Sequence, residues 1–212
     1  MNAGSTSQAI LFDLDRTLVD LQSFTDYAAA WESVRALLGE SSAVTVPETD
    51  WDRPTQACMS ALVAVAGTST WQEASDAIAR HERAAIPESM AMPRLTEAMD
   101  LVKDWPVAVI TLLPPDVARE VLAHHGVQID VVVGRQPGSR PKPHGDGLIL
   151  ACEALSVDPA SATMIGDATW DLAAAIDAGA GFIGVPFSAG AFPDGTRLAA
   201  DLTEAVSQAM RG

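Results

Sequence analysis

The sequence has little positive charge. Only two of its 212 residues are lysines, Lys103 and Lys142. Lysine and arginine together number 13 against 28 aspartates and glutamates, so the formal net charge is −15. A protein that binds nucleic acid or an anionic membrane needs a basic surface to neutralise phosphate groups, and no basic cluster occurs along this chain. We therefore expect neither a nucleic-acid nor a membrane partner.

Cysteines and long apolar runs are also scarce. Cys58 and Cys152 are the two cysteines, and neither lies in a C-x-x-C pattern, so a disulfide framework and a zinc site are both unsupported. Free thiols fit a reducing compartment, and we expect a cytoplasmic location. Residues 1–8 lack the basic and apolar regions of a signal peptide. No run of about 20 apolar residues predicts a transmembrane helix.

Hydrophobic residues make up 48% of the chain and charged residues 19%, which excludes global disorder. Short apolar runs without polar alternation predict strands that are buried on both faces of a parallel sheet. They cover residues 9–12, 107–112, 129–133, 163–165 and 181–185. Helical patterns over 115–125, 145–155 and 168–178 separate the last four runs. This alternation predicts an α/β fold with a Rossmann-like core of three layers.

A gap of about 70 residues separates the first two predicted strands. Apolar residues recur there at helical spacing over 21–38, 55–66 and 70–86, and prolines and glycines punctuate the stretch. A crossover between parallel strands needs only about a dozen residues. We therefore predict a small all-helical domain at 20–92, inserted into a core domain that comprises residues 1–19 and 93–212.

The strongest chemical signal directly follows the first strand. Asp13 and Asp15 leave the carboxyl end of this strand, where open α/β sheets bind their ligands. Carboxylates this close repel each other unless a proton or cation lies between them, and a hard divalent ion such as Mg²⁺ suits oxygen ligands. The alternative interpretation is that both residues merely cap the following turn.

Three weaker signals follow the later strands. Gly166 allows a tight turn, after which Asp167 and Asp171 either face the same site or only stabilise a helix N-terminus. Lys142 stands between two prolines, where it either binds an anion or is only a solvated loop residue. Thr111 ends the second strand, where its hydroxyl either holds a phosphate oxygen or has no such role.

All four signals fall at the carboxyl ends of predicted strands, and these ends converge on one edge of a parallel sheet. Together they offer carboxylates for a cation, a lysine and a hydroxyl for an anion, and a carboxylate nucleophile. This set of groups is what metal-assisted phosphoryl transfer requires.

The chain resembles the haloacid dehalogenase (HAD) superfamily of phosphatases over nearly its whole length. The motifs that carry the resemblance are D-L-D-R-T-L at 13–18, Thr111, P-K-P at 141–143 and G-D-x-x-x-D at 166–171. The inserted domain is similar to the C1-type helical cap of phosphoglycolate phosphatase and β-phosphoglucomutase relatives. Two positions depart from the pattern: Arg16 stands where glycine is usual, and Leu112 where a small polar residue is common.

The resemblance implies that Asp13 is the nucleophile and forms an aspartyl-phosphate, and that Asp15 acts as the general acid and base. It implies that Mg²⁺ binds Asp13, the backbone carbonyl of Asp15, and Asp167. Lys142 would hold and stabilise the phosphoryl group.

Three further roles follow from the same resemblance. Thr111, together with Lys142, would bind the phosphoryl oxygens. Asp171 would orient the metal site or Lys142, and Thr17 would fix the loop by hydrogen bonding. The implied substrate is a small phosphorylated metabolite, and we expect a monomer or homodimer.

Two other functions stay open: a sugar phosphomutase, which shares all four motifs, and a binding or regulatory module whose catalytic site has decayed. A dehalogenase would lack Asp15, and a phosphonate hydrolase would need a lysine within 20–93, where none occurs. Cap residues should decide the substrate. The candidates are Trp31, Arg35, Trp51, Arg53, Trp71, His81 and Arg83.

Overall fold

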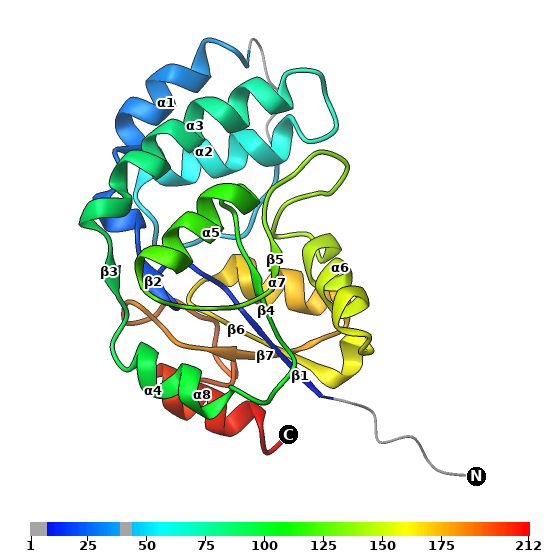
Figure 1. Ribbon diagram of the computed structural model, residues 1–212. Coiled ribbons are helices and arrows are strands. Elements are labelled where there is room, and N and C mark those ends of the chain that lie inside the picture. The colour runs from blue at the N-terminus through cyan, green and yellow to red at the C-terminus, as the bar shows by residue number, and fades with distance from the viewer. Residues whose placement is uncertain (1–7, 39–43) are drawn as a thin grey trace.

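The computed structural model describes residues 8–38 and 44–212. Most of the N-terminal segment that we examined for a signal peptide therefore lies outside the described residues. Within the described residues, helices cover both sides of a central sheet (Figure 1). A group of three helices stands at one end of this core.

The central sheet has five parallel strands in the order β5-β4-β1-β6-β7. The first strand, β1 (Ala9–Phe12), lies between β4 (Val107–Ile110) and β6 (Ala162–Gly166). The edge strands are β5 (Val131–Val133) and β7 (Gly181–Gly184). All five predicted strands are present, and their ends differ by no more than two residues from the apolar runs.

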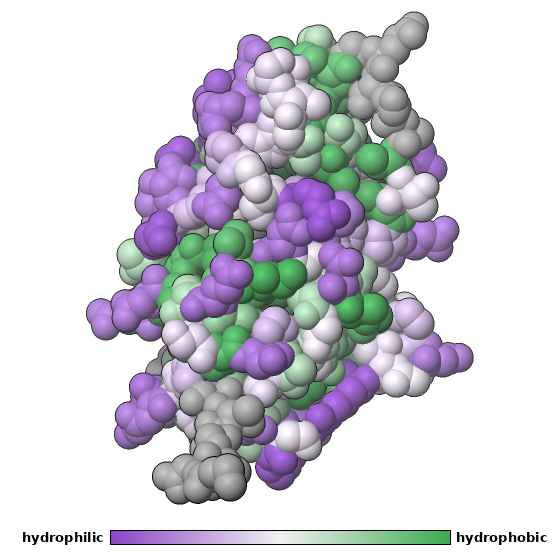
Figure 2. Space-filling model, turned by 90° about the vertical axis from the view of Figure 1, so that its right-hand side faces the viewer, coloured by the Kyte–Doolittle hydropathy of each residue, from purple (hydrophilic) through white to green (hydrophobic). Residues whose placement is uncertain are grey.

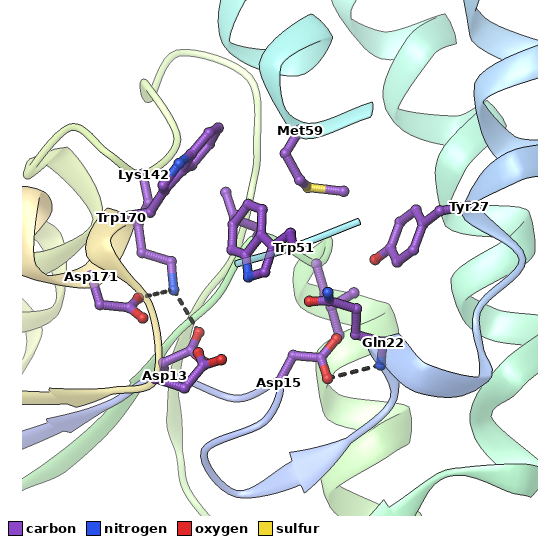
Figure 3. Close-up of a pocket in the computed structure, with 12 residues that line it drawn as sticks. Asp13, Asp15, Gln22, Tyr27, Trp51, Met59, Lys142, Trp170 and Asp171 are labelled. Atoms are coloured by element: carbon purple, nitrogen blue, oxygen red, sulfur yellow. Dashed lines mark hydrogen bonds and ion pairs between the residues drawn. The ribbon is translucent and has the colours of Figure 1, made fainter. Parts of the chain in front are cut away.

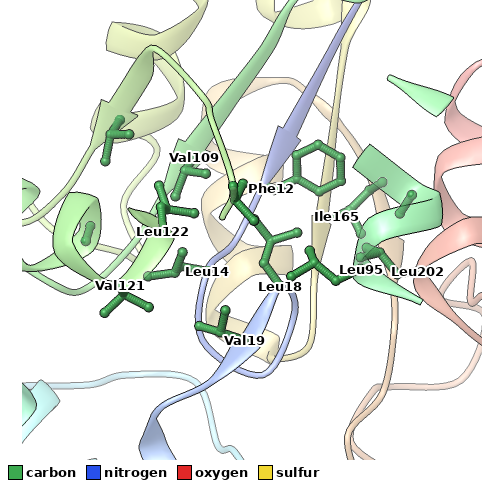
Figure 4. Packing of buried hydrophobic residues seen from close by; sticks show 14 of the residues in the cluster. Phe12, Leu14, Leu18, Val19, Leu95, Val109, Val121, Leu122, Ile165 and Leu202 are labelled. Atoms are coloured by element: carbon green, nitrogen blue, oxygen red, sulfur yellow. The ribbon is translucent and has the colours of Figure 1, made fainter. Parts of the chain in front are cut away.

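Alternate side chains of β1 pack into different layers. Ile10 and Phe12 belong to a cluster with residues of α4 (Leu95–Leu101), α5 (Pro115–His124) and α8 (Leu202–Ala209) (Figure 4). Ala9 and Leu11 pack against α6 (Asp146–Leu155) and α7 (Thr169–Ala178). The Rossmann-like core of three layers is therefore confirmed.

The insertion folds as an all-helical cap. Its helices are α1 (Tyr27–Arg35), α2 (Arg53–Ala64) and α3 (Trp71–Ala85). They share a hydrophobic cluster that includes Val34, Leu62 and Ile78. We predicted that the first of these helices begins at Leu21, but α1 begins six residues later. The reason is that Asp26 caps it by accepting a hydrogen bond from the Ala29 backbone N–H.

The two connections between cap and core pair with each other. A two-stranded antiparallel sheet joins β2 (Val19–Asp20) to β3 (Met90–Ala91). Short 3-10 turns, η1 (Gln22–Phe24) and η2 (Ile86–Glu88), continue into the cap, and a third, η3 (Pro159–Ser161), precedes β6. Strands of two residues are too short to show a hydrophobic period, so the sequence did not predict them. Our domain boundaries at 19/20 and 92/93 fall at this sheet and stay a prediction.

The helices α4 and α8 were also missed, although both carry buried apolar residues. They pack against each other and against the sheet, with Leu95 and Leu202 in contact with the same cluster (Figure 4). Among the described residues, no helix combines the length and the hydrophobicity that a membrane span requires. The face turned to the viewer in Figure 2 intersperses hydrophilic and hydrophobic side chains.

Candidate active site

Three strands deliver polar residues to one edge of the sheet, as the parallel arrangement predicts. Asp13, Thr111 and Asp167 each directly follow their strand, β1, β4 and β6. The backbone N–H of Asp13 donates to the Ile165 carbonyl oxygen at 2.8 Å, which continues the pairing of β1 with β6 by one residue. Lys142, from the loop between β5 and α6, reaches the same edge (Figure 3).

Lys142 is buried and joins two carboxylates. Its Nζ donates to Asp13 Oδ1 at 2.5 Å, to Asp171 Oδ1 at 2.6 Å and to the Ile110 carbonyl oxygen at 3.2 Å. Burial alone would lower the pKa of Lys142, but the charges of Asp13 and Asp171 outweigh it and raise the pKa. The lysine therefore stays protonated and all three of its N–H groups are satisfied.

The carboxylates outnumber the available positive charge. Oxygens of Asp13, Asp167 and Asp171 lie within 4.8 Å of one another, and all three side chains are buried. Burial raises the pKa of Asp13 to about 7, although the positive charge of Lys142 partly offsets this increase. Burial also raises the pKa of Asp167 well above its ordinary value, and the charge of Asp13 adds to this effect. Such a cluster of oxygen ligands fits a hard divalent cation.

Asp15 lies beside this cluster but outside it, and its carboxylate is held by the backbone. Asp15 Oδ1 accepts hydrogen bonds from the N–H groups of Leu21 and Gln22, each at 2.9 Å. Burial nevertheless raises the pKa of Asp15 to about 7, because these bonds only partly offset it. Asp15 is therefore positioned to exchange a proton near neutral pH.

The G-D-x-x-x-D motif serves helix and site together. Asp171 lies in the first turn of α7, and its Oδ2 accepts a hydrogen bond from the Ala168 backbone N–H at 3.1 Å. This contact is the one expected of a residue that stabilises a helix N-terminus. Its other oxygen, Oδ1, accepts from Lys142. A Cβ atom at Gly166 would lie 2.5 Å from the Asp171 carboxyl group, so a glycine is needed for this close approach.

Arg16 shows why glycine is usual at its position. Its φ is 62°, in the left-handed region that favours glycine. The guanidinium lies over the Phe187 ring at 4.4 Å, and Nε is 3.9 Å from Asp20. The extra charge is thus directed away from the carboxylate cluster, and Arg16 does not line the pocket.

Our expectation for Thr17 is not met. Its Oγ1 is buried but has no hydrogen-bond partner among the described residues. Backbone bonds close the loop instead: the N–H groups of Leu18 and Val19 both donate to the Leu14 carbonyl oxygen. The backbone already satisfies the turn, which leaves the threonine hydroxyl no part in fixing it.

Thr111 is buried and does not line the pocket. Its Oγ1 accepts from the Leu113 N–H at 3.1 Å, and it is Leu112 and Leu113 that line the cavity. Phosphate binding by Thr111 therefore stays a prediction. Of the seven cap candidates, Trp51 lines the pocket, whereas Arg35 pairs with Glu32 on the surface.

The cap side of the pocket is aromatic and apolar. Trp51 packs against Trp170 of the core, with ring centroids 5.1 Å apart at an angle of 45°. Further lining residues are Gln22, Tyr27, Met59, Leu112 and Leu113 (Figure 3). From the sequence we did not predict Gln22, Tyr27, Met59, Leu113 or Trp170 as contributors to the site, and we noted Leu112 only as a departure from the family's pattern. A signal existed for Trp170, which directly precedes Asp171 in the motif.

A buried ion pair joins cap and core beside the pocket. Arg135, in the loop after β5, donates from Nη1 and Nη2 to the two carboxylate oxygens of Glu82 in α3, at 2.8 and 2.7 Å. Its other bonds go to Ser75 and the Leu112 carbonyl oxygen. Both charged side chains are fully buried. We did not single out Arg135, although it too follows a predicted strand.

A comparison with protein families identifies this arrangement. Residues 8–179 match the model of the haloacid dehalogenase-like hydrolases. The chain belongs to this family. The resemblance of its motifs is thereby confirmed, and the protein is an enzyme of a hydrolase family.

Individual relatives agree with this assignment. The chain is 30% identical to the validoxylamine A 7′-phosphate phosphatase of Streptomyces hygroscopicus subsp. limoneus, with 92% of this chain and 93% of that protein covered. It is 27% identical to a phosphoglycolate phosphatase of Chromobacterium violaceum, with 92% and 91% covered. Among solved structures, the phosphate complex of CbbY from Rhodobacter sphaeroides matches with a TM-score of 0.69 at 22% identity. The match covers 93% of this chain and 96% of that one.

Proposed function

We propose that the protein is a Mg²⁺-dependent phosphatase that hydrolyses a small phosphorylated metabolite through an aspartyl-phosphate. One observation carries the proposal: Asp13 is a buried carboxylate at the edge of the sheet, 2.5 Å from Lys142, with Asp15 two residues further along. The direct test is phosphate release from p-nitrophenyl phosphate in the presence of Mg²⁺. Complete absence of release, from this compound and from a panel of phosphorylated metabolites, would contradict the proposal.

In the first step, Asp13 attacks the phosphorus atom. Its Oδ1 is held by Lys142, and its second oxygen makes no hydrogen bond with any described residue, so a lone pair is free for attack. A bond forms between this oxygen and phosphorus, and the bond from phosphorus to the ester oxygen breaks. Asp15 donates its proton to that oxygen, which leaves as an alcohol. The pKa of Asp15 near 7 supports this role.

In the second step, Asp15, now a carboxylate, takes a proton from water. The water oxygen attacks phosphorus, the bond to Asp13 breaks, and inorganic phosphate leaves. The ammonium group of Lys142 is 2.5 Å from Asp13 and therefore stabilises negative charge on the phosphoryl oxygens throughout. Asp171 keeps this ammonium group in place through its own contact at 2.6 Å.

The residues at this edge fit the proposed metal. Asp13, Asp167 and Asp171 offer only oxygen ligands, and Lys142 alone does not balance their charges. We propose that Asp13, Asp167 and the backbone carbonyl of Asp15 hold the ion, with Asp171 orienting Lys142. When bound, Mg²⁺ would supply positive charge for the phosphoryl oxygens.

Removal of the metal should abolish turnover. We expect EDTA to stop phosphate release and excess Mg²⁺ to restore it, whereas Ca²⁺ should restore it poorly, because its larger and looser coordination misplaces the nucleophile. Circular dichroism recorded in EDTA should show that the fold persists. Full activity in the chelator would contradict the metal's role.

The cap must open to admit a substrate. The pocket has a free volume of about 30 Å³, which is room for a water molecule or two but not for an organic phosphate. Two contacts outside the pocket bind the cap to the core: Glu82 binds Arg135, and Asp50 accepts a hydrogen bond from Ser188. We propose that the cap moves as a unit on the linkers at 20–23 and 87–93, where β2 pairs with β3.

Cross-linking the cap to the core tests this movement. In the double variant Asp50→Cys and Ser188→Cys, oxidation or a short bis-thiol linker should remove most of the turnover. Reduction of the disulfide should restore it. Each single variant, treated in the same way, is the control and should keep its activity. A fully cross-linked protein with undiminished turnover would show that substrate enters without cap movement.

No observation favours the phosphomutase or the decayed module over this function. We further propose that the protein works as a monomer or homodimer in the cytoplasm, without nucleic-acid or membrane partners. The net charge of −15 and the two unpaired cysteines support this proposal.

A further inference from the structure

Two buried hydrogen-bond donors in the pocket have no partner. Nε1 of Trp51 and Nε2 of Gln22 are both buried, and neither donates to any described residue. The two residues come from different parts of the cap side and line the same pocket. In Figure 3 the indole nitrogen of Trp51 is turned toward the carboxylate cluster. Buried donors in folded proteins are almost always satisfied, so these two are expected to meet acceptor oxygens of a ligand.

The same pocket offers no second positive charge. Among its described lining residues, Lys142 is the sole lysine, arginine or histidine, and in the proposed reaction its charge serves the phosphoryl group. Arg135 is also fully engaged, by Glu82, Ser75 and Leu112. A leaving group with its own carboxylate or second phosphate would therefore be buried near several aspartates without a counter-ion, which is strongly unfavourable.

The remaining wall is apolar and aromatic. Trp51, Trp170, Met59 and Leu112 form a surface for the C–H face of a carbon skeleton, and Tyr27 lies on the same side. A ligand that satisfies both features carries C–H groups and uncharged oxygen acceptors together. Polyhydroxylated carbon chains and rings have this character.

We propose that Trp51 and Gln22 are specificity-determining residues that select an uncharged, polyhydroxylated leaving group. This inference rests on the proposed phosphatase function. The indole N–H and the amide N–H donate to hydroxyl oxygens of the skeleton, while Lys142 holds the phosphoryl group. The site rejects substrates that carry a second anionic group, including bisphosphates and phosphorylated carboxylic acids. Such rejection also disfavours mutase chemistry that proceeds through a bisphosphate.

Matched substrate pairs test the selectivity for charge. Sorbitol 6-phosphate and 6-phosphogluconate differ at the terminal carbon, which is a hydroxymethyl group in one and a carboxylate in the other. Glycerol 3-phosphate and 3-phosphoglycerate form a shorter pair of the same kind. We expect kcat/KM to be higher for the uncharged member of each pair, by about tenfold or more.

The outcomes separate the two proposals. If the enzyme releases phosphate from p-nitrophenyl phosphate but hydrolyses the anionic members equally well or better, the selectivity is overturned and the phosphatase function stands. If no compound is hydrolysed, including p-nitrophenyl phosphate, the phosphatase function fails and the selectivity falls with it.

Conservative variants test the two donors. Trp51→Phe keeps an aromatic ring but removes the N–H, and Gln22→Met keeps the length of the side chain without the amide. Each should lower kcat/KM for sorbitol 6-phosphate about tenfold, the typical effect of one lost hydrogen bond. The loss for p-nitrophenyl phosphate should be several-fold smaller, because its leaving group has no hydroxyl groups to accept these bonds, so the ratio of kcat/KM for the two substrates should shift.

Trp71 provides the matched control. Its Nε1 is also buried without a partner among the described residues, and it lies in the cap but does not line this pocket. Trp71→Phe should leave the ratio of kcat/KM for the two substrates unchanged. The assignment is overturned if Trp51→Phe affects both substrates equally, or if Trp71→Phe shifts the ratio as much as Trp51→Phe does.

Discussion

Replacement of Asp13 with Asn should lower kcat by about 10³-fold or more, because an amide is a poor nucleophile and no other group occupies its place. Asp15 is held by the N–H groups of Leu21 and Gln22 and lies outside the carboxylate cluster. It therefore does not replace Asp13 in the attack. The measurement is single-turnover phosphate release with the purified variant.

The fold should survive this substitution. Asp13 is one of several buried carboxylates that repel one another, and Lys142 keeps its contact with Asp171. We therefore expect little or no loss in the free energy of unfolding. Asp100→Asn, which changes an exposed carboxylate on α4, is the matched control and should keep full activity. A folded Asp13→Asn protein with more than a few per cent of wild-type turnover would refute the nucleophile assignment.

Replacement of Glu82 with Gln should destabilise the protein by about 3–5 kcal/mol, because it leaves the buried charge of Arg135 without its counter-ion. Neither Glu82 nor Arg135 has any exposed side-chain surface, and two hydrogen bonds, at 2.8 and 2.7 Å, join them. Urea unfolding measures the effect. On the same interface, Arg83 binds Glu120 at the surface, and Glu120→Gln should cost less than about 1 kcal/mol.

A double variant distinguishes the lost pairing from general damage to the interface. With Glu82→Met and Arg135→Met together, no buried charge remains, and most of the stability should return. If the double variant is as unstable as Glu82→Gln, the interface depends on something other than charge balance, and our explanation is wrong.

The sequence by itself determined the five strands of the core sheet, the three helices that separate the last four strands, and the residues that end the strands. Buried parallel strands need continuous apolar runs, so all five could be located without a structure. Because parallel strands end at a common edge, Asp13, Lys142 and Asp167 were predicted to meet there, and the structure places them together. The motifs around them were sufficient to indicate the family.

Only the tertiary structure decided what completes the pocket. Gln22 carries no local pattern that points to a ligand, and Trp51 was only one of seven cap candidates. Burial that leaves their donors unpaired is what singles both residues out. Arg135 and Glu82 are 53 residues apart in the chain, and their pairing depends on how the cap packs against the loop after β5. Local periodicity reports which face of an element is buried, but it carries no information about which distant side chain meets it there.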